Sequence, residues 1–444
     1  MTNKKVYADG AAGAIGKIHA FEKFGSILGL ERMNELMALL GDPQDKLKVL
    51  HVAGTNGKGS VCRYLYSVLQ ENGYRTGLYT SPFLEVFNER IELDGAYISD
   101  ADLTEYTDRV LKQVQCMVDA GKQSPTEFEV ITAIALLYFY EKGADYVVLE
   151  VGLGGRGDST NVCKAPLISV ITSISYDHTD RLGDTLAKIA WEKSGIIKDG
   201  CPVVTSAKAP EALEVIEQTA AEHHALFFET RRIPYKVKEQ GLDGSCFDVD
   251  FQGVLFEELR ISMVGAHQIE NAIAALAAIN LLEERGEARI QKDKLYSGLR
   301  KAKQIGRFEV LTAPDAKPVV IIDGAHNPDG AKVLRDAMKT FCPSQRILMV
   351  TGMLADKDTT GILRSFRDIT TDFIATEPVN PRSMTKEALK DALQAQGARC
   401  LALLEPEAAV EEALRRKEDY DVILFAGSLY LIGQIRGMLR EAVR

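Results

Sequence analysis

The stretch Lys48–Ser60, KVLHVAGTNGKGS, combines residue types that can bind a phosphate group. A short apolar run leads into a glycine-rich turn that contains Lys58 and ends at the hydroxyl residue Ser60. The segment that follows, VCRYLYSVLQENG, is predicted to form a helix ending at Gly73. In a strand–loop–helix unit, backbone N–H groups converge, the helix dipole favours negative charge, and a lysine adds a mobile cation. The pattern therefore predicts a phosphate-binding loop.

The spacing of this loop differs from that of the common P-loop, G-x-x-x-x-G-K-[ST]. Only two residues separate Gly54 from Gly57, and Gly59 lies between Lys58 and Ser60. This variant spacing argues against an ordinary GTPase or small-molecule kinase. The alternative for a glycine-rich turn alone is a tight connection without a ligand.

Glu150 and His178 are candidate metal ligands near the ends of two predicted strands, 145–151 and 167–173. A buried carboxylate is costly without a cation, and oxygen ligands beside phosphates suit Mg²⁺. The alternative for Glu150 is a strand end open to solvent. Imidazole is an unusual Mg²⁺ ligand, so the residues alone leave His178 open between a ligand and a hydrogen-bonded loop histidine. Taken singly, Ser81 reads as a turn residue and Lys193 as a surface lysine.

The second half of the chain contains IIDGAHNPDG, which places Asp323 at a strand end and His326 in the following loop. Asp323 could accept a hydrogen bond from a ribose, whereas the alternative is a cap for the helix beginning near Pro328. Three further residues are each compatible with a site or a turn: Arg307, Lys357 and Ser428.

These residues require a scaffold, and apolar strands alternating with helices predict a parallel sheet with right-handed crossovers. In such sheets ligands bind beyond the carboxyl ends of the strands. The Gly54 loop, Ser81, Glu150 and Asp177–His178 all fall at predicted carboxyl ends. Periodicity weakens over 296–311, which is the predicted domain boundary, and the strand–helix alternation then restarts.

Composition narrows the possible partners and compartment. The chain has 444 residues and a formal net charge of −10, which argues against nucleic acid as a partner. Its seven cysteines form no CxxC pair, as expected for reduced thiols in the cytoplasm. No apolar stretch reaches the roughly 18–20 residues of a membrane span, and the N-terminus lacks a signal-peptide pattern. We therefore expect a cytoplasmic protein without a membrane partner.

Nine segments together resemble one family, and they occur in the family's order from about Gly25 to Leu431. They are HVAGTNGKGS, YTSPFLEVFNERI, VLEVGLGGRGDSTNV, SYDHTDRLG, AWEKSGIIK, GRFEV, IDGAHNPDG, GMLADKD and AGSLYL. The set closely resembles the folylpolyglutamate synthase and dihydrofolate synthase family of the Mur ligase superfamily. The loop HVAGTNGKGS with the TSP sequence is specific for the folate branch.

The resemblance implies an ATP-dependent ligase that joins L-glutamate to a folate carboxylate through an acyl phosphate. It implies an α/β fold with an N-terminal P-loop ATPase domain built on a mostly parallel sheet, a smaller C-terminal Rossmann-like domain, and a folate site between them. The expected boundaries are 1–298 for the ATP-binding domain, 299–306 for a linker and 307–444 for the glutamate-ligase domain. The acceptor is tetrahydrofolate, dihydropteroate or both, and a monomer is favoured by the resemblance.

The resemblance also assigns roles to individual residues. ATP would be bound by a set comprising Gly57, Lys58, Gly59, Ser60, Asn271, Arg307 and Asp323. Magnesium, as two ions, would be held by Ser81, Glu150 and His178. Lys193 matches a lysine that is carbamylated in the family, and His326, Lys357 and Ser428 match positions near the γ-phosphate and the incoming glutamate. Catalytic roles would fall to Lys58, Lys193 and His326.

One position departs from the superfamily, which often has His-Asn where this chain has His267–Gln268. Two alternative functions remain. A peptidoglycan-precursor ligase of the same superfamily usually carries an additional N-terminal domain, whereas here the loop begins by residue 54. A non-catalytic ATP-binding protein would bind ATP without amino-acid-dependent release of ADP.

Overall fold

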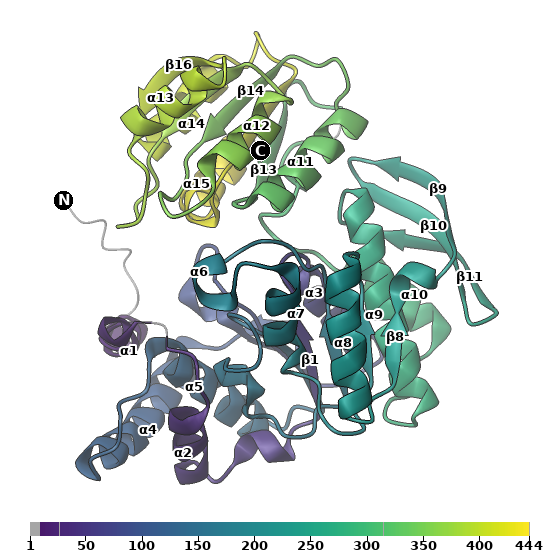
Figure 1. The fold of residues 1–444 in the computed structure, drawn as a ribbon. Helices are drawn as coiled ribbons and strands as arrows, with labels where there is room; N and C mark the ends of the chain where they lie inside the picture. The colour runs from purple at the N-terminus through teal and green to yellow at the C-terminus, as the bar shows by residue number, and fades with distance from the viewer. Residues whose placement is uncertain (1–8, 26, 314, 444) are drawn as a thin grey trace. The chain divides into compact units, whose positions relative to one another are not determined.

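The computed structural model describes residues 9–25, 27–313 and 315–443, which form two compact units (Figure 1). The first unit contains the described residues up to Pro234, with Asp250–Val254 and Glu270–Lys301. The second contains Tyr235–Val249, Leu255–Ile269 and the described residues from Ala302 onward. The chain passes between the units more than once, and its last crossing is between Lys301 and Ala302. The division at 298 and 307 stays a prediction.

The first unit is built on an eight-stranded sheet that is mostly parallel, as predicted. Its strands, in spatial order, are β4 (Ala96–Tyr97), β3 (Ile91–Leu93), β2 (Thr76–Tyr79), β5 (Tyr146–Glu150), β1 (Val49–Ala53), β6 (Ile168–Ile171), β7 (Val203–Thr205) and β8 (Phe227–Glu229). Neighbours from β2 to β8 pair in parallel, whereas β3 and β4 form an antiparallel extension. The strands β1, β5 and β6 are buried along their whole length, which explains their continuous apolar sequences.

Helices accompany this sheet along the chain (Figure 1). They are α1 (Asp9–His19), α2 (Glu31–Leu39), α3 (Lys58–Glu71), α4 (Asp100–Asp119), α5 (Glu127–Glu141), α6 (Thr179–Leu182), α7 (Leu186–Ser194), α8 (Pro210–Glu222), α9 (Ala266–Glu284) and α10 (Lys292–Lys301). Short 3₁₀ segments are η1 (Glu22–Phe24), η2 (Pro43–Lys46), η3 (Phe87–Arg90), η4 (Ser159–Val162) and η5 (Thr230–Arg232). Helix α10 occupies the start of the stretch whose sequence periodicity is weak.

Two apolar cores hold these elements. One joins α2, α4 and α5 to β1, β2 and β5, and α5 is buried without interruption from Glu129 to Phe139, as its apolar sequence predicts. The other packs α7 and α8 against the end of β1 and against β6 and β7. Because both cores include β1, the strand before the phosphate loop is fixed from both sides.

The second unit contains a six-stranded sheet and most residues of a three-stranded antiparallel sheet. The smaller sheet has the order β11 (Val254–Ile261), β10 (Gly244–Phe251) and β9 (Tyr235–Gly241). The larger has the order β12 (Glu309–Val310), β13 (Val319–Asp323), β17 (Val422–Ala426), β14 (Ile347–Thr351), β15 (Asp372–Thr376) and β16 (Arg399–Leu404). Only β12 runs antiparallel to its neighbour within this larger sheet. The helices are α11 (Pro328–Phe341), α12 (Thr359–Arg367), α13 (Lys386–Ala395), α14 (Pro406–Arg415) and α15 (Leu429–Ala442).

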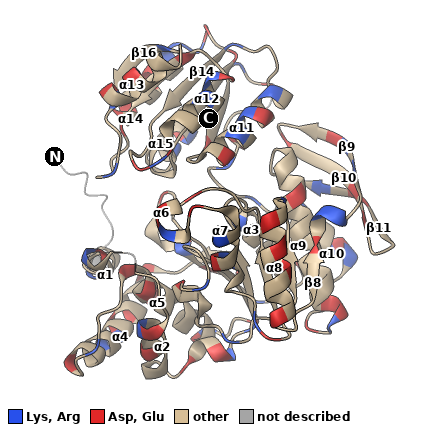
Figure 2. Ribbon diagram, in the orientation of Figure 1, with Lys and Arg blue, Asp and Glu red and all other residues tan. Residues whose placement is uncertain are grey.

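Charged residues of both signs are interspersed on helices such as α11, whereas the charged residues of α8 are all acidic (Figure 2). The mixed pattern is that of an ordinary solvated surface. Among the described residues, no helix combines the length and the apolar character needed to cross a membrane.

Candidate functional site

In the first unit, four neighbouring strands end at one edge of the sheet. The strands β2, β5, β1 and β6 are adjacent and parallel, so the segments after them begin side by side. Ser81 follows β2, Glu150 ends β5, Gly54 follows β1, and the segment leading to His178 follows β6. The expectation that these residues lie at carboxyl ends is met by this strand order.

The glycines of the loop are required by conformation and by close neighbours. Gly54 has φ 146° and Gly57 has φ 91°, values that other residues rarely adopt. A Cβ at Gly54 would lie 1.8 Å from Oγ1 of Thr172. A Cβ at Gly57 would lie 2.6 Å from Oδ1 of Asn271, which places the Asn271 side chain beside the loop.

Hydrogen bonds tie the loop to the segment that follows β6. The backbone N–H of Thr55 donates to Ser173 O at 2.7 Å, and the Thr172 hydroxyl donates to Asn56 O at 2.7 Å. Helix α3 begins directly after the loop, and its N-cap residue, Gly57, has no side chain to cap the first turn. An uncapped helix N-terminus of this kind favours an anion.

Two lysines meet at one carbonyl of the loop. Nζ of Lys58 donates to the carbonyl oxygens of Gly54 (3.1 Å) and Thr55 (3.2 Å), while Nζ of Lys193, from α7, donates to Gly54 O at 2.8 Å. Lys193 is only 5% exposed. Burial lowers its pKa from 10.5 to about 7, and the charge of Lys58 acts in the same direction against the opposing Asp177. Lys193 is therefore a buried amine with a substantial neutral fraction at physiological pH.

Ser81 and Glu150, two of the three predicted magnesium ligands, are in contact. The backbone N–H of Ser81 donates to a carboxylate oxygen of Glu150 at 3.3 Å, and Glu150 is buried. His178 is exposed and forms the N-cap of α6 in a left-handed backbone conformation. In the described part of the chain, no three His, Cys, Asp or Glu side chains gather as a ready-made metal cluster. The buried carboxylate and serine suit a hard cation that takes its remaining ligands from phosphates and water.

A buried polar network lies beside this edge, and the sequence reasoning did not single it out. Nε2 of His51, in β1, lies 2.9 Å from Oγ1 of Thr160, which donates to Asp158 at 2.5 Å. His51 is fully buried, and burial lowers its pKa to about 3, so it is neutral. The signal available in the sequence was a single histidine inside an apolar strand.

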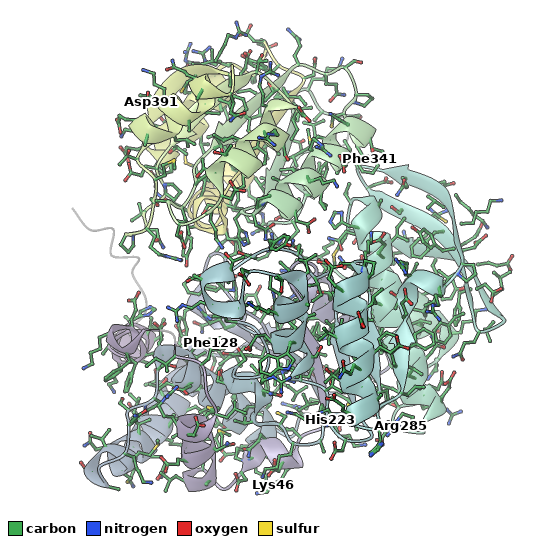
Figure 3. The ribbon with its side chains drawn as sticks, viewed as in Figure 1. Lys46, Phe128, His223, Arg285, Phe341 and Asp391 are labelled. Atoms are coloured by element: carbon green, nitrogen blue, oxygen red, sulfur yellow. The ribbon has the colours of Figure 1, made fainter. Side chains whose placement is uncertain are left out.

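The segment after β5 also carries two close aromatic contacts. A Cβ at Gly152 would lie 2.5 Å from the ring of Phe128, which Figure 3 labels on α5. The guanidinium carbon of Arg156 lies 3.8 Å from the ring centroid of Trp191 on α7, and Arg156 also donates to the Trp191 carbonyl. Trp191 remains half exposed.

In the second unit, the adjacent strands β13, β17 and β14 bring the remaining candidates to one edge. A Cβ at Gly324, after β13, would lie 2.3 Å from Leu429, at the start of α15. A Cβ at Gly427, after β17, would lie 2.8 Å from the carbonyl of Gly352, after β14. The segments carrying His326, Ser428 and Lys357 therefore start side by side.

Asp323 does not cap the following helix. The cap of α11 is Asn327, which accepts from the N–H of Gly330 at 2.7 Å. The carboxylate of Asp323 instead accepts from the backbone N–H groups of Phe308 and Ala325, both at 2.7 Å. Burial raises the pKa of Asp323, and the nearby Arg307 opposes the rise.

The other candidates of this edge have structural contacts of their own. Nη1 of Arg307 donates to Gly324 O at 3.2 Å, and Nδ1 of His326 lies 2.8 Å from the same oxygen. The Ser428 hydroxyl caps α15 by accepting from the N–H of Tyr430 at 3.1 Å. Lys357 lies partly buried in the loop after β14.

Two family models match the chain. The Mur ligase middle domain matches residues 52–279, and the Mur ligase glutamate ligase domain matches residues 306–429. The dihydrofolate synthase/folylpolyglutamate synthase of Bacillus subtilis is 39% identical over 95% of this chain and 97% of its own length.

Solved structures agree with the sequence comparison. A Mycobacterium tuberculosis folylpolyglutamate synthase, complexed with ADP and AMPPCP, matches with a TM-score of 0.89 at 30% identity, covering 97% of this chain and 99% of its own. An Escherichia coli enzyme in complex with DHPP and ADP matches with a TM-score of 0.86 at 30% identity, covering 98% and 99%. With both Mur ligase models matched and full-length relatives of one kind, the chain belongs to the dihydrofolate synthase/folylpolyglutamate synthase family and is an ATP-dependent acid–amino-acid ligase.

Proposed function

We propose that the protein joins L-glutamate to the carboxylate of a tetrahydrofolate, with dihydropteroate as a second acceptor. The double name of the Bacillus subtilis relative supports two acceptors. The contact that carries the proposal is the meeting of Lys58 and Lys193 on the Gly54 carbonyl, within a loop whose helix N-terminus favours anions.

In the proposed reaction a folate carboxylate attacks the γ-phosphorus of ATP, ADP leaves, and an acyl phosphate forms. The amine of glutamate then attacks the acyl carbon, and phosphate leaves as the amide bond forms. The loop from Gly57 to Ser60 binds the phosphates, with Gly59 allowing close approach of the backbone. Lys58 and Arg307 neutralise the charge that develops during transfer.

Further residues orient the reactants. Asn271, beside Gly57, and Asp323 contact the nucleotide. His326 lies near the γ-phosphate, and Lys357 and Ser428 hold the carboxylate of glutamate. Mg²⁺ held by Ser81, Glu150 and His178 would supply positive charge beside the phosphates.

Lys193 is proposed to carry a carbamate. Its neutral amine attacks CO₂ and releases one proton, and the product has a negative charge suited to a cation. The carbamate nitrogen keeps one hydrogen, so it can still donate to Gly54 O. Incubation with ¹³C-bicarbonate should give a carbamate resonance that is absent from Lys193→Ala; equal spectra for the two proteins would contradict this step.

The function is tested by measuring ADP release with ATP, Mg²⁺, glutamate and tetrahydrofolate, together with the mass of the folate product. The expected result is ADP release that needs both glutamate and folate, and a product longer by one glutamate. Dihydropteroate replaces tetrahydrofolate in a parallel assay, and chelation of Mg²⁺ should stop both reactions. ATP binding without amino-acid-dependent ADP release would favour the non-catalytic alternative.

The monomeric state and the cytoplasm are also proposals. All seven cysteines are free, which suits a reducing compartment. Light scattering after size exclusion should give a mass near 48.8 kDa, and twice that mass would contradict the monomer.

A further inference from the structure

Arg307 lies in a turn whose backbone is held by two carboxylates. Oε2 of Glu309 accepts from the N–H of Gly306 at 2.8 Å, and Asp323 accepts from the N–H of Phe308 at 2.7 Å. The backbone N–H groups of both neighbours of Arg307 are therefore fixed. The N–H of Gly324 also donates to Gly306 O at 2.8 Å, which ties the turn to the end of β13.

The turn adopts an unfavourable backbone conformation. Phe308 has φ 39°, in the left-handed region that side chains rarely occupy. Its ring is 3% exposed and packs edge-on against Phe341 at a centroid distance of 6.1 Å. The buried ring and the two carboxylates together hold a conformation that the isolated sequence would not favour.

Glu309 is itself held by Arg436 on α15. Nε of Arg436 lies 2.9 Å from Oε2 of Glu309, and Nη2 lies 2.7 Å from Oε1. The side chains are 7% and 20% exposed, so the pair is largely withdrawn from water. A two-point contact of this kind fixes the plane of the carboxylate, which a single lysine bond would not do.

The pair also controls charge beside the turn. A buried ion pair contributes little to stability compared with apolar residues of similar volume. Glu309 is only two positions from Arg307, and without Arg436 its carboxylate would be available to pair with Arg307 and to draw its guanidinium away from the phosphates. Arg436 therefore both orients Glu309 and neutralises it.

We propose that Glu309 and Arg436 are positioning residues for the nucleotide: the pair fixes the turn that presents Arg307 to the ATP phosphates. This inference rests on the proposed function, because it assumes that Arg307 contacts ATP. Neither residue needs to touch the nucleotide, and both act through the backbone of Gly306 and the charge near Arg307.

The test is a double-mutant cycle on nucleotide affinity. The Kd of a non-hydrolysable ATP analogue with Mg²⁺ is measured by calorimetry for the wild type, Arg307→Ala, Arg436→Met and the double variant. Arg436→Met keeps an unbranched apolar stem and removes the charge. It should weaken binding about tenfold, the size of a lost charge-assisted contact. In the Arg307→Ala background the same change should have almost no effect, because Arg436 acts through Arg307.

Two further variants separate positioning from loss of stability. Arg436→Lys keeps the charge, so it guards against failure to fold, and it should recover part of the affinity. Leu389→Ala empties a fully buried site on α13 in the same unit. It should lower the melting temperature while leaving the KM for ATP unchanged, whereas Arg436→Met raises the KM for ATP more than that for glutamate.

The outcomes distinguish failure of the proposed function from failure of the positioning proposal. A wild type that binds no ATP analogue would overturn the proposed function itself. If the wild type binds the analogue but Arg307→Ala leaves its Kd unchanged, Arg307 does not contact the nucleotide. The positioning proposal then fails as well. If Arg436→Met weakens binding equally with and without Arg307, the pair is structural only, and the positioning proposal fails.

Discussion

The two lysines that donate to the Gly54 carbonyl are suited to different roles because their surroundings differ. Lys58 is partly exposed on the first turn of α3, where its Nζ can leave the loop carbonyls for a phosphate. Lys193 is buried, and the neighbouring charge of Lys58 helps to lower its pKa to about 7. One lysine is thus suited to act as a charge, and the other as a nucleophile toward CO₂.

Replacement of Lys58 by Met should reduce affinity for the ATP analogue about tenfold or more, since one charge-assisted contact to phosphate is lost. It should also abolish folate-dependent ADP release while the circular dichroism spectrum stays unchanged. Lys188→Met is the matched control, because Lys188 is an exposed lysine on α7 that pairs with Asp184. Equal affinity of Lys58→Met and wild type would remove the loop lysine from its assigned role.

His51 gives a prediction about acid stability. Its pKa is about 3 in the folded chain and 6.5 in the unfolded chain, so only the unfolded chain takes up a proton between these values. Stability is therefore lost as the pH falls below 6.5, by roughly 2 kcal/mol at pH 5. His51→Gln keeps an N–H donor at similar reach of Thr160 and removes the titration.

The measurement for His51 is the free energy of unfolding by urea at pH 7.5 and pH 5.0. The difference between the two pH values should be about 2 kcal/mol smaller in His51→Gln than in the wild type. His223→Gln, at an exposed residue labelled in Figure 3, controls for removal of a histidine as such. If the free energy of unfolding differs between the two pH values as much in His51→Gln as in the wild type, another group causes the acid sensitivity.

At the scale of elements, the strand–loop–helix unit could be predicted because its signals are local. The apolar run of β1, the glycines and the start of α3 are adjacent in sequence, and the buried helix α5 followed from its apolar composition. The partners of these elements were not local. Thr172 and Asn271 approach Gly54 and Gly57 from 118 and 214 positions away, and no spacing rule reports such contacts.

Gly57 is constrained both by its positive φ and by the nearby Asn271 side chain. A matched pair of substitutions can separate these two constraints. Gly57→Ala and Gly73→Ala both place a side chain at positive φ, 91° and 85°, at a cost of roughly 1–2 kcal/mol each. Only at Gly57 would the new Cβ meet a neighbour, because Gly73 faces open space. Both variants should therefore lose stability in urea denaturation, with the larger loss in Gly57→Ala because its Cβ would lie 2.6 Å from Asn271. Only Gly57→Ala should lose affinity for the ATP analogue. Loss of affinity in both would place its origin in α3 as a whole.

At the scale of the whole molecule, the repeated strand–helix alternation predicted two α/β units, and the family resemblance predicted their type. The sequence did not predict which residues hold the site residues in position. The helix-cap alternative for Asp323 is wrong, because Asn327 caps α11, and the nucleotide contact of Asp323 stays a prediction. Nothing in the sequence indicated that the Asp323 carboxylate also holds the backbone of the Arg307 turn. Arg436, in the last helix, gave no signal because an arginine on a helix is ordinarily solvated.

Nucleotide binding should stabilise the folded chain by mass action. At a concentration 100 times its Kd, the ATP analogue with Mg²⁺ should add about 2.7 kcal/mol to the free energy of unfolding. The check is a urea titration followed by circular dichroism with and without the analogue. Lys58→Met at the same analogue concentration should show a smaller gain, and an equal gain in both proteins would indicate binding elsewhere.

Trp191 is the single tryptophan of the chain, and it lies two positions before Lys193 on α7 with the Arg156 guanidinium over its ring. Its emission therefore comes from one place in the fold, without a label. A charge change at Lys193, or a shift of the loop that carries Arg156, is expected to change the electric field at the indole. If Lys193 takes up CO₂ as proposed, addition of bicarbonate should therefore change the emission of Trp191, which can be recorded without a label.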